Sequence, residues 1–211
     1  MIRLHGYWRS TASYRVRIAL ELKGLAWESV AHDLRTGAQR DADYRAINPQ
    51  GLVPALDVDG ATITQSPAIL EWLDERFPDP PLLPAALADR AVVRAMAALV
   101  ACDIHPLNNL RVLQALRRDF AADEEQIAAW IAHWIGEGFA ALEQLVARHG
   151  GRFAFGDAPT LADCCLVPQV YSARRFAVPL DAYPRLIACA DHCLSLEPVQ
   201  RAMPERQPDA D

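Results

Sequence analysis

Residues 52–67 read LVPALDVDGATITQSP, and this stretch decides the fold of the N-terminal part of the chain. Two short apolar runs flank the Asp-Gly dipeptide at 59–60, and that arrangement is the strongest short-range signal for a β-hairpin. Ser66 is suited to cap a helix and Pro67 to occupy its first position. The stretch therefore predicts two antiparallel strands followed by a helix over residues 68–76.

The residues before this hairpin predict a strand, a helix and a second strand. An apolar run at 2–7 suits a strand, apolar spacing over 13–23 indicates a helix, and a further strand follows at 27–32. Gly24 stands where a helix commonly has its C′ glycine. Because two strands joined through a helix pair in parallel, the whole order is β-α-β followed by β-β-α. That order is typical of the thioredoxin-like fold.

A proline-rich stretch, DPPLLP at 79–84, separates this part from the rest of the chain. Its three prolines cannot continue a helix. We therefore predict an α/β domain over residues 1–80, a linker over 81–86 and an all-α domain over 87–211.

The second domain shows helical patterns only. Helices are predicted over residues 89–120, 123–149, 161–176 and 183–196, with a break near His105 and Pro106. Thr160 and Asp163 have the spacing of a capping box at the start of one helix. The polar tail after Pro204 is expected to be frayed.

The composition is that of a globular protein, with 52% hydrophobic residues, 23% charged residues and a net charge of −6. It excludes intrinsic disorder, and the acidic balance argues against binding a nucleic-acid backbone. The longest apolar run, residues 95–102, is too short to cross a membrane. Basic residues interrupt any secretory signal near the start, so we expect a cytoplasmic protein with no nucleic-acid or membrane partner.

The five cysteines include no CxxC pair, and the histidines near them lack the spacing of zinc ligands. We expect no metal site. The cysteines are expected to be small buried apolar side chains in a reducing compartment.

A proline inside a predicted strand removes a hydrogen-bond donor from the sheet, so Val53-Pro54 needs an explanation. One explanation is an edge or bulge position. The other is a cis peptide bond, which about 5–6% of X-Pro bonds adopt. A cis bond would leave the Val53 N–H and C=O free to pair with an extended peptide ligand. The residues alone leave both explanations open.

Two predicted helix starts combine capping residues with ligand-binding chemistry. Gln65 and Ser66 precede a helix whose free N–H groups attract anions, so they could cap that helix or hold a carboxylate. In the run RSTAS at 9–13, hydroxyl groups could cap the first helix or donate to a thiolate at its N-terminus. No cysteine stands in this run, so a thiolate would have to come from a ligand.

Residues 7–20, YWRSTASYRVRIAL, closely resemble the opening signature of the zeta-class glutathione transferases. The resemblance continues in order through NPQGLVP at 48–54, QSPAI at 65–69, DIHPLNNLR at 103–111, TLAD at 160–163 and LVPQV at 166–170. It spans nearly the whole chain. It implies the glutathione transferase fold, with an α/β thioredoxin-like N-terminal domain and an all-α C-terminal domain, and it implies a homodimer.

The resemblance also implies a glutathione site, with roles taken from the family pattern. On the first domain the expected residues are Ser10 and Thr11 at the thiolate, Val53 and cis Pro54 at the cysteinyl backbone, Gln65 and Ser66 at the γ-glutamyl carboxylate, and Gln39 at the glycyl end. From the helical domain, some across a dimer interface, the expected residues are Asp103, His105 and Asn109.

The activity that the resemblance implies is a glutathione-dependent cis–trans isomerisation of maleylacetoacetate or maleylpyruvate to the fumaryl product, in aromatic-compound degradation. Carboxylates of such substrates need cationic partners, and the substrate-side arginines are Arg9, Arg111 and Arg175. The alternative for Arg175 is a solvated pair with Arg174. Many zeta enzymes have cysteine where this chain has Ala12, so no protein thiol assists the ligand here.

Two rival classes follow from the same residues. One is a glutathione transferase or peroxidase that conjugates or reduces small electrophiles, and the three substrate-side arginines argue against it. The other is a binding module without catalysis, against which the retained hydroxyl pair argues. Between the two isomerase substrates we favour maleylacetoacetate, because it is the commoner assignment in the family.

Overall fold

The computed structural model describes residues 1–211 of the chain. By their contacts these residues form two compact units, Met1–Leu83 together with Leu194–Asp211, and Pro84–Cys193. The boundary after Leu83 falls within the proline-rich stretch. At the other end the units differ from the predicted domains, because Leu194–Asp211 belongs with the first unit and not with the helical one.

The first unit contains a four-stranded sheet with the order β2-β1-β3-β4. Its strands are β1 (Ile2–Gly6), β2 (Trp27–Ala31), β3 (Ala55–Val58) and β4 (Ala61–Thr64). β1 runs parallel to β2 and antiparallel to β3, and β3 pairs with β4 as a hairpin. Asp59 and Gly60 both have positive φ, at 50° and 80°, which is what a type I′ turn requires. The predicted order of strands is confirmed.

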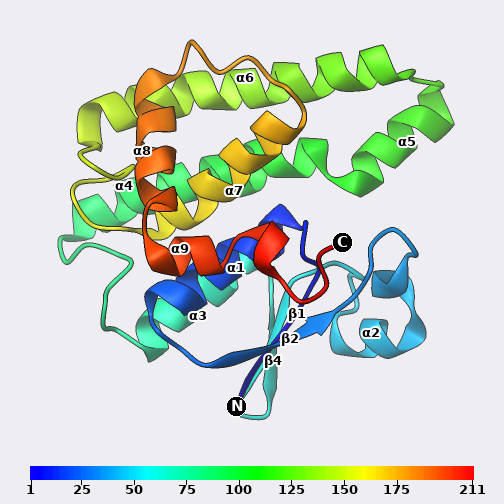
Figure 1. The fold of residues 1–211 in the computed structure, drawn as a ribbon, viewed down its shortest axis with the longest axis horizontal. Coiled ribbons are helices and arrows are strands. Elements are labelled where there is room, and N and C mark those ends of the chain that lie inside the picture. Colours follow the sequence, from blue (N-terminus) through cyan, green and yellow to red (C-terminus); the bar gives the residue numbers. More distant parts are fainter. The chain divides into compact units, whose positions relative to one another are not determined.

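The helices of the first unit are α1 (Thr11–Leu22), α2 (Ala42–Ile47), α3 (Ser66–Arg76) and α9 (Glu197–Arg201). Short 3₁₀ turns add Ala38–Arg40 and Pro204–Arg206. α1 packs against α3 and α9 (Figure 1). Its side chains Val16 and Leu20 are fully buried, as are Leu56 on β3 and Leu73 on α3, and each such burial stabilises the fold by about 1.5–3 kcal/mol.

The expectation of a frayed tail is wrong. Pro204–Arg206 forms a 3₁₀ turn, and Gln207 is buried. The Gln207 amide donates to the carbonyls of Arg201, at 3.0 Å, and Met203, at 2.8 Å. The tail is ordered because its polar side chains find backbone partners, and nothing in its composition could reveal those partners.

The second unit is built from helices. They are α4 (Leu87–Ala98), α5 (Leu110–Phe120), α6 (Glu124–His149), α7 (Leu161–Arg175) and α8 (Pro184–Leu194). A π-helical turn, Leu99–Ile104, and a 3₁₀ turn, His105–Asn108, lie between α4 and α5, so the predicted break near His105 is confirmed. Ile135 and Phe139 of α6 are fully buried in its core.

The start of α7 is held by a buried carboxylate. Asp163 accepts hydrogen bonds from the N–H and hydroxyl of Thr160, at 2.8 and 2.9 Å, and from the N–H of Ala154, at 2.8 Å. The sequence pattern expected the threonine hydroxyl to accept from the Asp163 amide. The capping box is present as the pattern predicted. The Asp163 amide also donates to the Thr160 carbonyl at 3.1 Å, and the Thr160 hydroxyl donates to the carboxylate.

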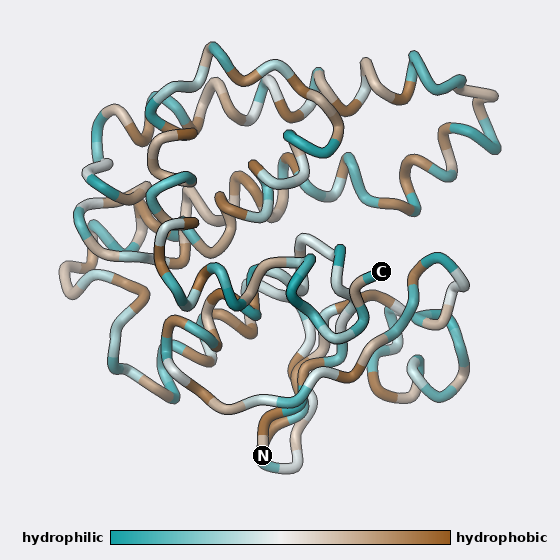
Figure 2. The backbone as a smooth tube through the Cα atoms, viewed as in Figure 1, coloured by the Kyte–Doolittle hydropathy of each residue, from teal (hydrophilic) through white to brown (hydrophobic).

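Hydrophilic and hydrophobic residues are mixed along the long helices, including α6 (Figure 2). None of the helices combines the length and the apolar character needed to cross a membrane. All five cysteines are free, and four of them are buried as expected, but Cys102 is exposed. It lies on the π-helical turn, whose outer side the sequence pattern did not reveal. Burial raises the pKa of the Cys189 thiol to about 11.

Candidate active site

Ser10 is the N-cap residue of α1 and is half-buried. Its hydroxyl oxygen accepts from the Ser13 N–H at 3.2 Å. A hydroxyl that accepts through one lone pair still has its proton to donate, and the positive end of the helix dipole favours a negative charge beside it. Thr11, the first residue of the helix, is buried. The first turn of α1 can therefore both cap itself and stabilise an anion.

The start of α3 differs from the expected capping pattern. Gln65 is the N-cap residue, with a positive φ of 70°, and Ser66 is already helical. A non-glycine residue in this region costs about 1–3 kcal/mol and is common at binding sites. The Gln65 amide donates to the Gln50 side chain at 2.5 Å. Ser66, as the first helical residue, is not the cap, and its buried hydroxyl accepts from the Arg15 guanidinium at 3.1 Å.

Arg15 is a residue that the sequence analysis missed. Its side chain is almost completely buried, with 2% exposure, and reaches from α1 to the N-terminus of α3. A buried guanidinium behind Ser66 adds positive charge to a helix start that already favours anions. A signal existed in the sequence: Arg15 stands in an apolar helical run, and an arginine is almost never fully buried without a partner.

The segment before β3 presents unpaired backbone groups. Val53-Pro54 is a cis peptide bond, as the resemblance implied. No hydrogen bond within the chain engages the backbone N–H or C=O of Val53. The carbonyl of the preceding Leu52 accepts from the Tyr44 hydroxyl and the Asn48 amide, each at 2.7 Å. Burial raises the pKa of Tyr44 to about 12, so this phenol stays a hydrogen-bond donor at neutral pH.

Gln39 lies on the 3₁₀ turn Ala38–Arg40, and its side chain is only 6% exposed. Its Oε1 has no hydrogen-bond partner in the chain. A buried polar atom without a partner is unusual and points to a ligand or water. Gly51 lies against the same residue with a φ of 62°. A Cβ at Gly51 would come within 3.0 Å of the Gln39 carbonyl oxygen. This close approach joins Gln39 to the segment that carries Val53.

A chain of contacts thus brings the candidates of the first unit together. The Gln39 carbonyl lies close to Gly51. The neighbouring Gln50 accepts a hydrogen bond from Gln65, and Ser66 accepts one from Arg15 of α1. The structure also places Arg9 beside Ser10, half-buried, with its guanidinium 5.2 Å from the centroid of the Trp8 ring.

In the second unit, four of the five candidates follow one another from the π-helical turn to the first turn of α5. Asp103 is exposed on the π-helical turn, and His105 is half-buried at the start of the 3₁₀ turn. Asn109 caps α5 by accepting from the N–H of Arg111 at 3.2 Å, and Arg111 is exposed. Asn109 therefore has a structural role that the resemblance did not imply.

Arg175 comes from a different helix, at the end of α7, and its guanidinium lies 4.5 Å from the centroid of the Phe176 ring. A guanidinium that contacts an aromatic ring can also donate its N–H groups to a carboxylate. Its neighbour Arg174 forms an ion pair with Asp191 at 2.7 Å. The two adjacent arginines thus have different surroundings.

A row of titratable groups crosses the sheet beside this site. His5 Nδ1 lies 3.0 Å from His32 Nε2, and His5 Nε2 lies 3.0 Å from the Asp57 carboxylate. The His32 ring packs on Tyr44, with centroids 4.2 Å apart. Burial, and next the nearby His5, lower the pKa of His32 below its usual 6.5, while Asp41 opposes them.

The lowered pKa of His32 predicts a pH-dependent stability. Between the pKa of His32 in the folded chain and 6.5, the unfolded chain binds more protons than the folded chain. The contribution of neutral His32 to the free energy of unfolding is therefore complete above pH 6.5 and is lost as the pH falls. His32→Gln is expected to flatten the fall in the urea midpoint between about pH 7 and pH 5. The exposed His133→Gln serves as the control, and an unchanged slope in His32→Gln would contradict the assignment.

Comparison with known proteins agrees with this arrangement. Residues 9–76 match the family model of the glutathione S-transferase N-terminal domain, and residues 108–188 match that of the C-terminal domain. A maleylpyruvate isomerase from Ralstonia sp. is 51% identical, covering 99% of this chain and 100% of that protein. A maleylacetoacetate isomerase from Pseudomonas aeruginosa is 52% identical, covering 99% of this chain and 98% of that protein.

Solved structures give the same result. One is the holo structure of a maleylpyruvate isomerase described as a bacterial glutathione S-transferase in the zeta class, with a TM-score of 0.97 and 51% identity over 99% of this chain and 100% of that one. Another is a maleylacetoacetate isomerase from Methylobacterium extorquens AM1 with bound malonate and glutathione, with a TM-score of 0.95 and 42% identity over 99% of each chain. The chain therefore belongs to the zeta class of the glutathione S-transferase family.

Proposed function

We propose that the protein is a glutathione-dependent cis–trans isomerase that converts maleylacetoacetate or maleylpyruvate to the fumaryl product. The observation that carries this proposal is the Ser10 hydroxyl at the N-terminus of α1, in a chain about half identical over its full length to isomerases of both names. Relatives with these names extend from bacteria to Dictyostelium discoideum.

The residues of the first unit fit glutathione. The unpaired Val53 backbone suits the cysteinyl peptide group, and the unpartnered Gln39 Oε1 suits the glycyl amide. Gln65 and Ser66 stand at a helix N-terminus backed by the Arg15 guanidinium, where a γ-glutamyl carboxylate gains both dipole and charge. Bound glutathione was found in the Methylobacterium relative.

When bound, glutathione supplies a thiolate, whose reversible addition to the conjugated double bond allows that bond to rotate. The chain's task is to hold the thiol deprotonated near neutral pH, from an ordinary thiol pKa of about 8.5. Each pKa unit corresponds to about 1.4 kcal/mol, so the Ser10 hydroxyl and the dipole of α1 suffice for a shift of one to two units. Ala12 offers no thiol, so Ser10, with Thr11 beside it, carries this role.

The substrate carboxylates require cations. Arg9 beside Ser10, and Arg111 and Arg175 in the second unit, are proposed to bind them, and malonate, a small dicarboxylate, was found bound in the Methylobacterium relative. Asp103, His105 and Asn109 are proposed to complete the glutathione site. A homodimer and a cytoplasmic location belong to the same proposal, and the free cysteines suit the reducing compartment.

Arg175→Ala is expected to raise the KM for maleylpyruvate at least about tenfold, because a charge-assisted pair with a carboxylate is lost, while glutathione affinity stays unchanged. Arg174→Ala is the matched control, since that side chain is paired with Asp191. Steady-state kinetics with each variant measure the difference. Equal effects of the two substitutions would remove Arg175 from the substrate site.

The alternative is a transferase or peroxidase that uses the same thiolate on other electrophiles. The decisive experiment compares kcat/KM for maleylacetoacetate, maleylpyruvate, an aryl halide and a hydroperoxide with purified protein and glutathione. We expect isomerisation to dominate, with the higher kcat/KM identifying the physiological substrate. Activity on the halide or peroxide without isomerisation would favour the alternative.

A further inference from the structure

The turn over residues 7–10, which precedes α1, is bound on one side by the buried Arg17. The Ser10 N–H donates to the Tyr7 carbonyl at 3.0 Å, which closes a tight turn over residues 7–10. Arg17 donates to the Trp8 carbonyl at 2.8 Å and to the Tyr7 carbonyl at 3.5 Å. The same guanidinium donates to the carbonyl of Ala202 at 2.9 Å. Arg17 thus ties the turn to the C-terminal segment 202–211.

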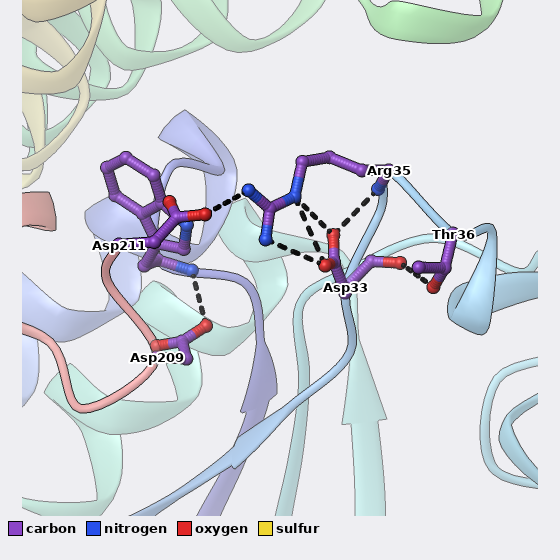
Figure 3. A network of polar contacts seen from close by, with 6 residues as sticks. Asp33, Arg35, Thr36, Asp209 and Asp211 are labelled. Carbon is purple, nitrogen blue, oxygen red and sulfur yellow. Dashed lines mark hydrogen bonds and ion pairs between the residues drawn. The ribbon is translucent and has the colours of Figure 1, made fainter.

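The C-terminal segment holds the other side of the turn. The Asp209 carboxylate accepts from the N–H of Trp8 at 2.9 Å (Figure 3). The Trp8 N–H belongs to the peptide group before Trp8, and the carbonyl that Arg17 binds belongs to the peptide group after it. The Tyr7–Trp8 and Trp8–Arg9 peptide groups, which precede the peptide group that joins Arg9 to Ser10, are therefore fixed by charged side chains on different segments of the chain.

The second contact of the C-terminal segment 202–211 with the first unit's other residues is weaker than the hydrogen bond between Asp209 and Trp8. Asp211 forms an ion pair with Arg35. Arg35 also donates to both carboxylate oxygens of Asp33 (Figure 3). Arg35 and Asp211 are about half exposed, at 48% and 56%, and such surface pairs contribute little. Asp209 differs because its partner is the backbone of the buried Trp8. A charge-assisted hydrogen bond to a backbone N–H is about twice as strong as a neutral one.

We propose that Asp209 is a positioning residue, which fixes the Ser10 hydroxyl by holding the Trp8 amide. This inference rests on the proposed role of Ser10 at the glutathione thiolate. A group that stabilises a developing charge must be held within about 0.5 Å of its productive position, and a loop achieves this only when other elements support it. Val53, Gln65 and Ser66, which are proposed to bind the rest of glutathione, form no hydrogen bond or ion pair with Asp209.

Loss of Asp209 should therefore raise the pKa of the bound glutathione thiol without changing the affinity for the glutathione peptide. In Asp209→Ala the pKa of protein-bound glutathione thiol, measured from the ultraviolet absorbance of the thiolate, is expected to rise by about one unit, a tenfold loss of thiolate preference. In Asp209→Asn, whose amide oxygen still accepts from the Trp8 N–H, we expect roughly a third of that rise. The dissociation constant of S-methylglutathione, which has no thiol to ionise, should stay within about twofold of the wild type in both variants.

Glu75→Ala is the matched control, because Glu75 is an exposed carboxylate of the same unit without a hydrogen bond or ion pair in the chain. It should leave the thiol pKa unchanged. If Asp209→Ala does not fold, Asp209→Asn decides the question in the same measurement. An unchanged thiol pKa in every folded Asp209 variant overturns the inference. A wild-type protein that does not lower the thiol pKa contradicts the proposed role of Ser10 instead, so the two failures are distinguishable.

Discussion

Ser10→Ala is expected to lower kcat for isomerisation by about 100-fold, the usual cost of removing one donor that stabilises a charge in an active site. The Ser10 hydroxyl accepts from the Ser13 N–H at the N-terminus of α1 and still has its proton to donate towards a bound thiolate. Without it the bound thiol should titrate at a higher pH, so the rate loss should shrink as the pH rises. The measurement is a pH profile of kcat for both proteins.

Two further variants separate catalysis from helix capping. Ser10→Ala also removes a capping bond, which costs about 1 kcal/mol of stability. Asp123→Ala removes the same kind of bond, from the Gln126 N–H at the start of α6, and should lose stability but not kcat. Ser10→Thr keeps the hydroxyl and should recover much of the rate. A Ser10→Ala enzyme with nearly wild-type kcat would exclude the role proposed for this residue.

Asp163→Ala is expected to destabilise the second unit by about 4 kcal/mol. The carboxylate is 1% exposed and satisfies the backbone N–H groups of Ala154 and Thr160. Removing it leaves both donors buried without a partner, and each such donor costs about 1–3 kcal/mol. Urea unfolding followed by circular dichroism measures the change.

The control for this prediction is Asp157→Ala. Asp157 is an exposed carboxylate in the same connection, and it accepts from the Arg152 N–H at 3.1 Å. Water replaces such an acceptor at little cost, so the urea midpoint should hardly move. Similar midpoints for the Asp163 and Asp157 variants would show that the buried hydrogen bonds do not determine the stability of α7.

Local signals in the sequence were sufficient to predict the four strands and the helices α1 and α3 of the first unit. The Asp-Gly turn has one favourable backbone solution, in which both residues take positive φ, so the hairpin and its register follow from two residues. The proline-rich stretch marks the unit boundary because proline cannot continue a helix. Such signals act over a few residues and do not depend on the rest of the fold.

Side-chain contacts between residues far apart in the sequence could not be predicted from local sequence patterns. Ser66 looks like a helix cap, but its hydroxyl binds Arg15, fifty-one positions earlier, and Gln65 is the cap residue. Residues after Pro204 look like a solvated tail, but Asp209 meets the Trp8 backbone 201 positions away. Propensity describes a residue's own backbone and not the group that will bind its side chain, so these contacts required the structure.

Of the predictions about the candidate site, the structure confirms one, and the roles of the individual residues stay predictions. The cis peptide bond at Val53-Pro54 was expected from the family resemblance and is confirmed, whereas the residues alone left it open. The roles of Ser10, Gln39 and Arg175 stay predictions, supported by a helix N-terminus, an unpartnered buried amide oxygen and a guanidinium over an aromatic ring respectively.

The central claim is that the thiol of bound glutathione performs the isomerisation at a site built by this chain. It is tested most directly by following the loss of maleylpyruvate absorbance with purified protein in glutathione, in S-methylglutathione and without either. The account predicts turnover with glutathione alone, because S-methylglutathione occupies the same contacts but cannot form a thiolate. Equal turnover with S-methylglutathione, or without any glutathione, would contradict it.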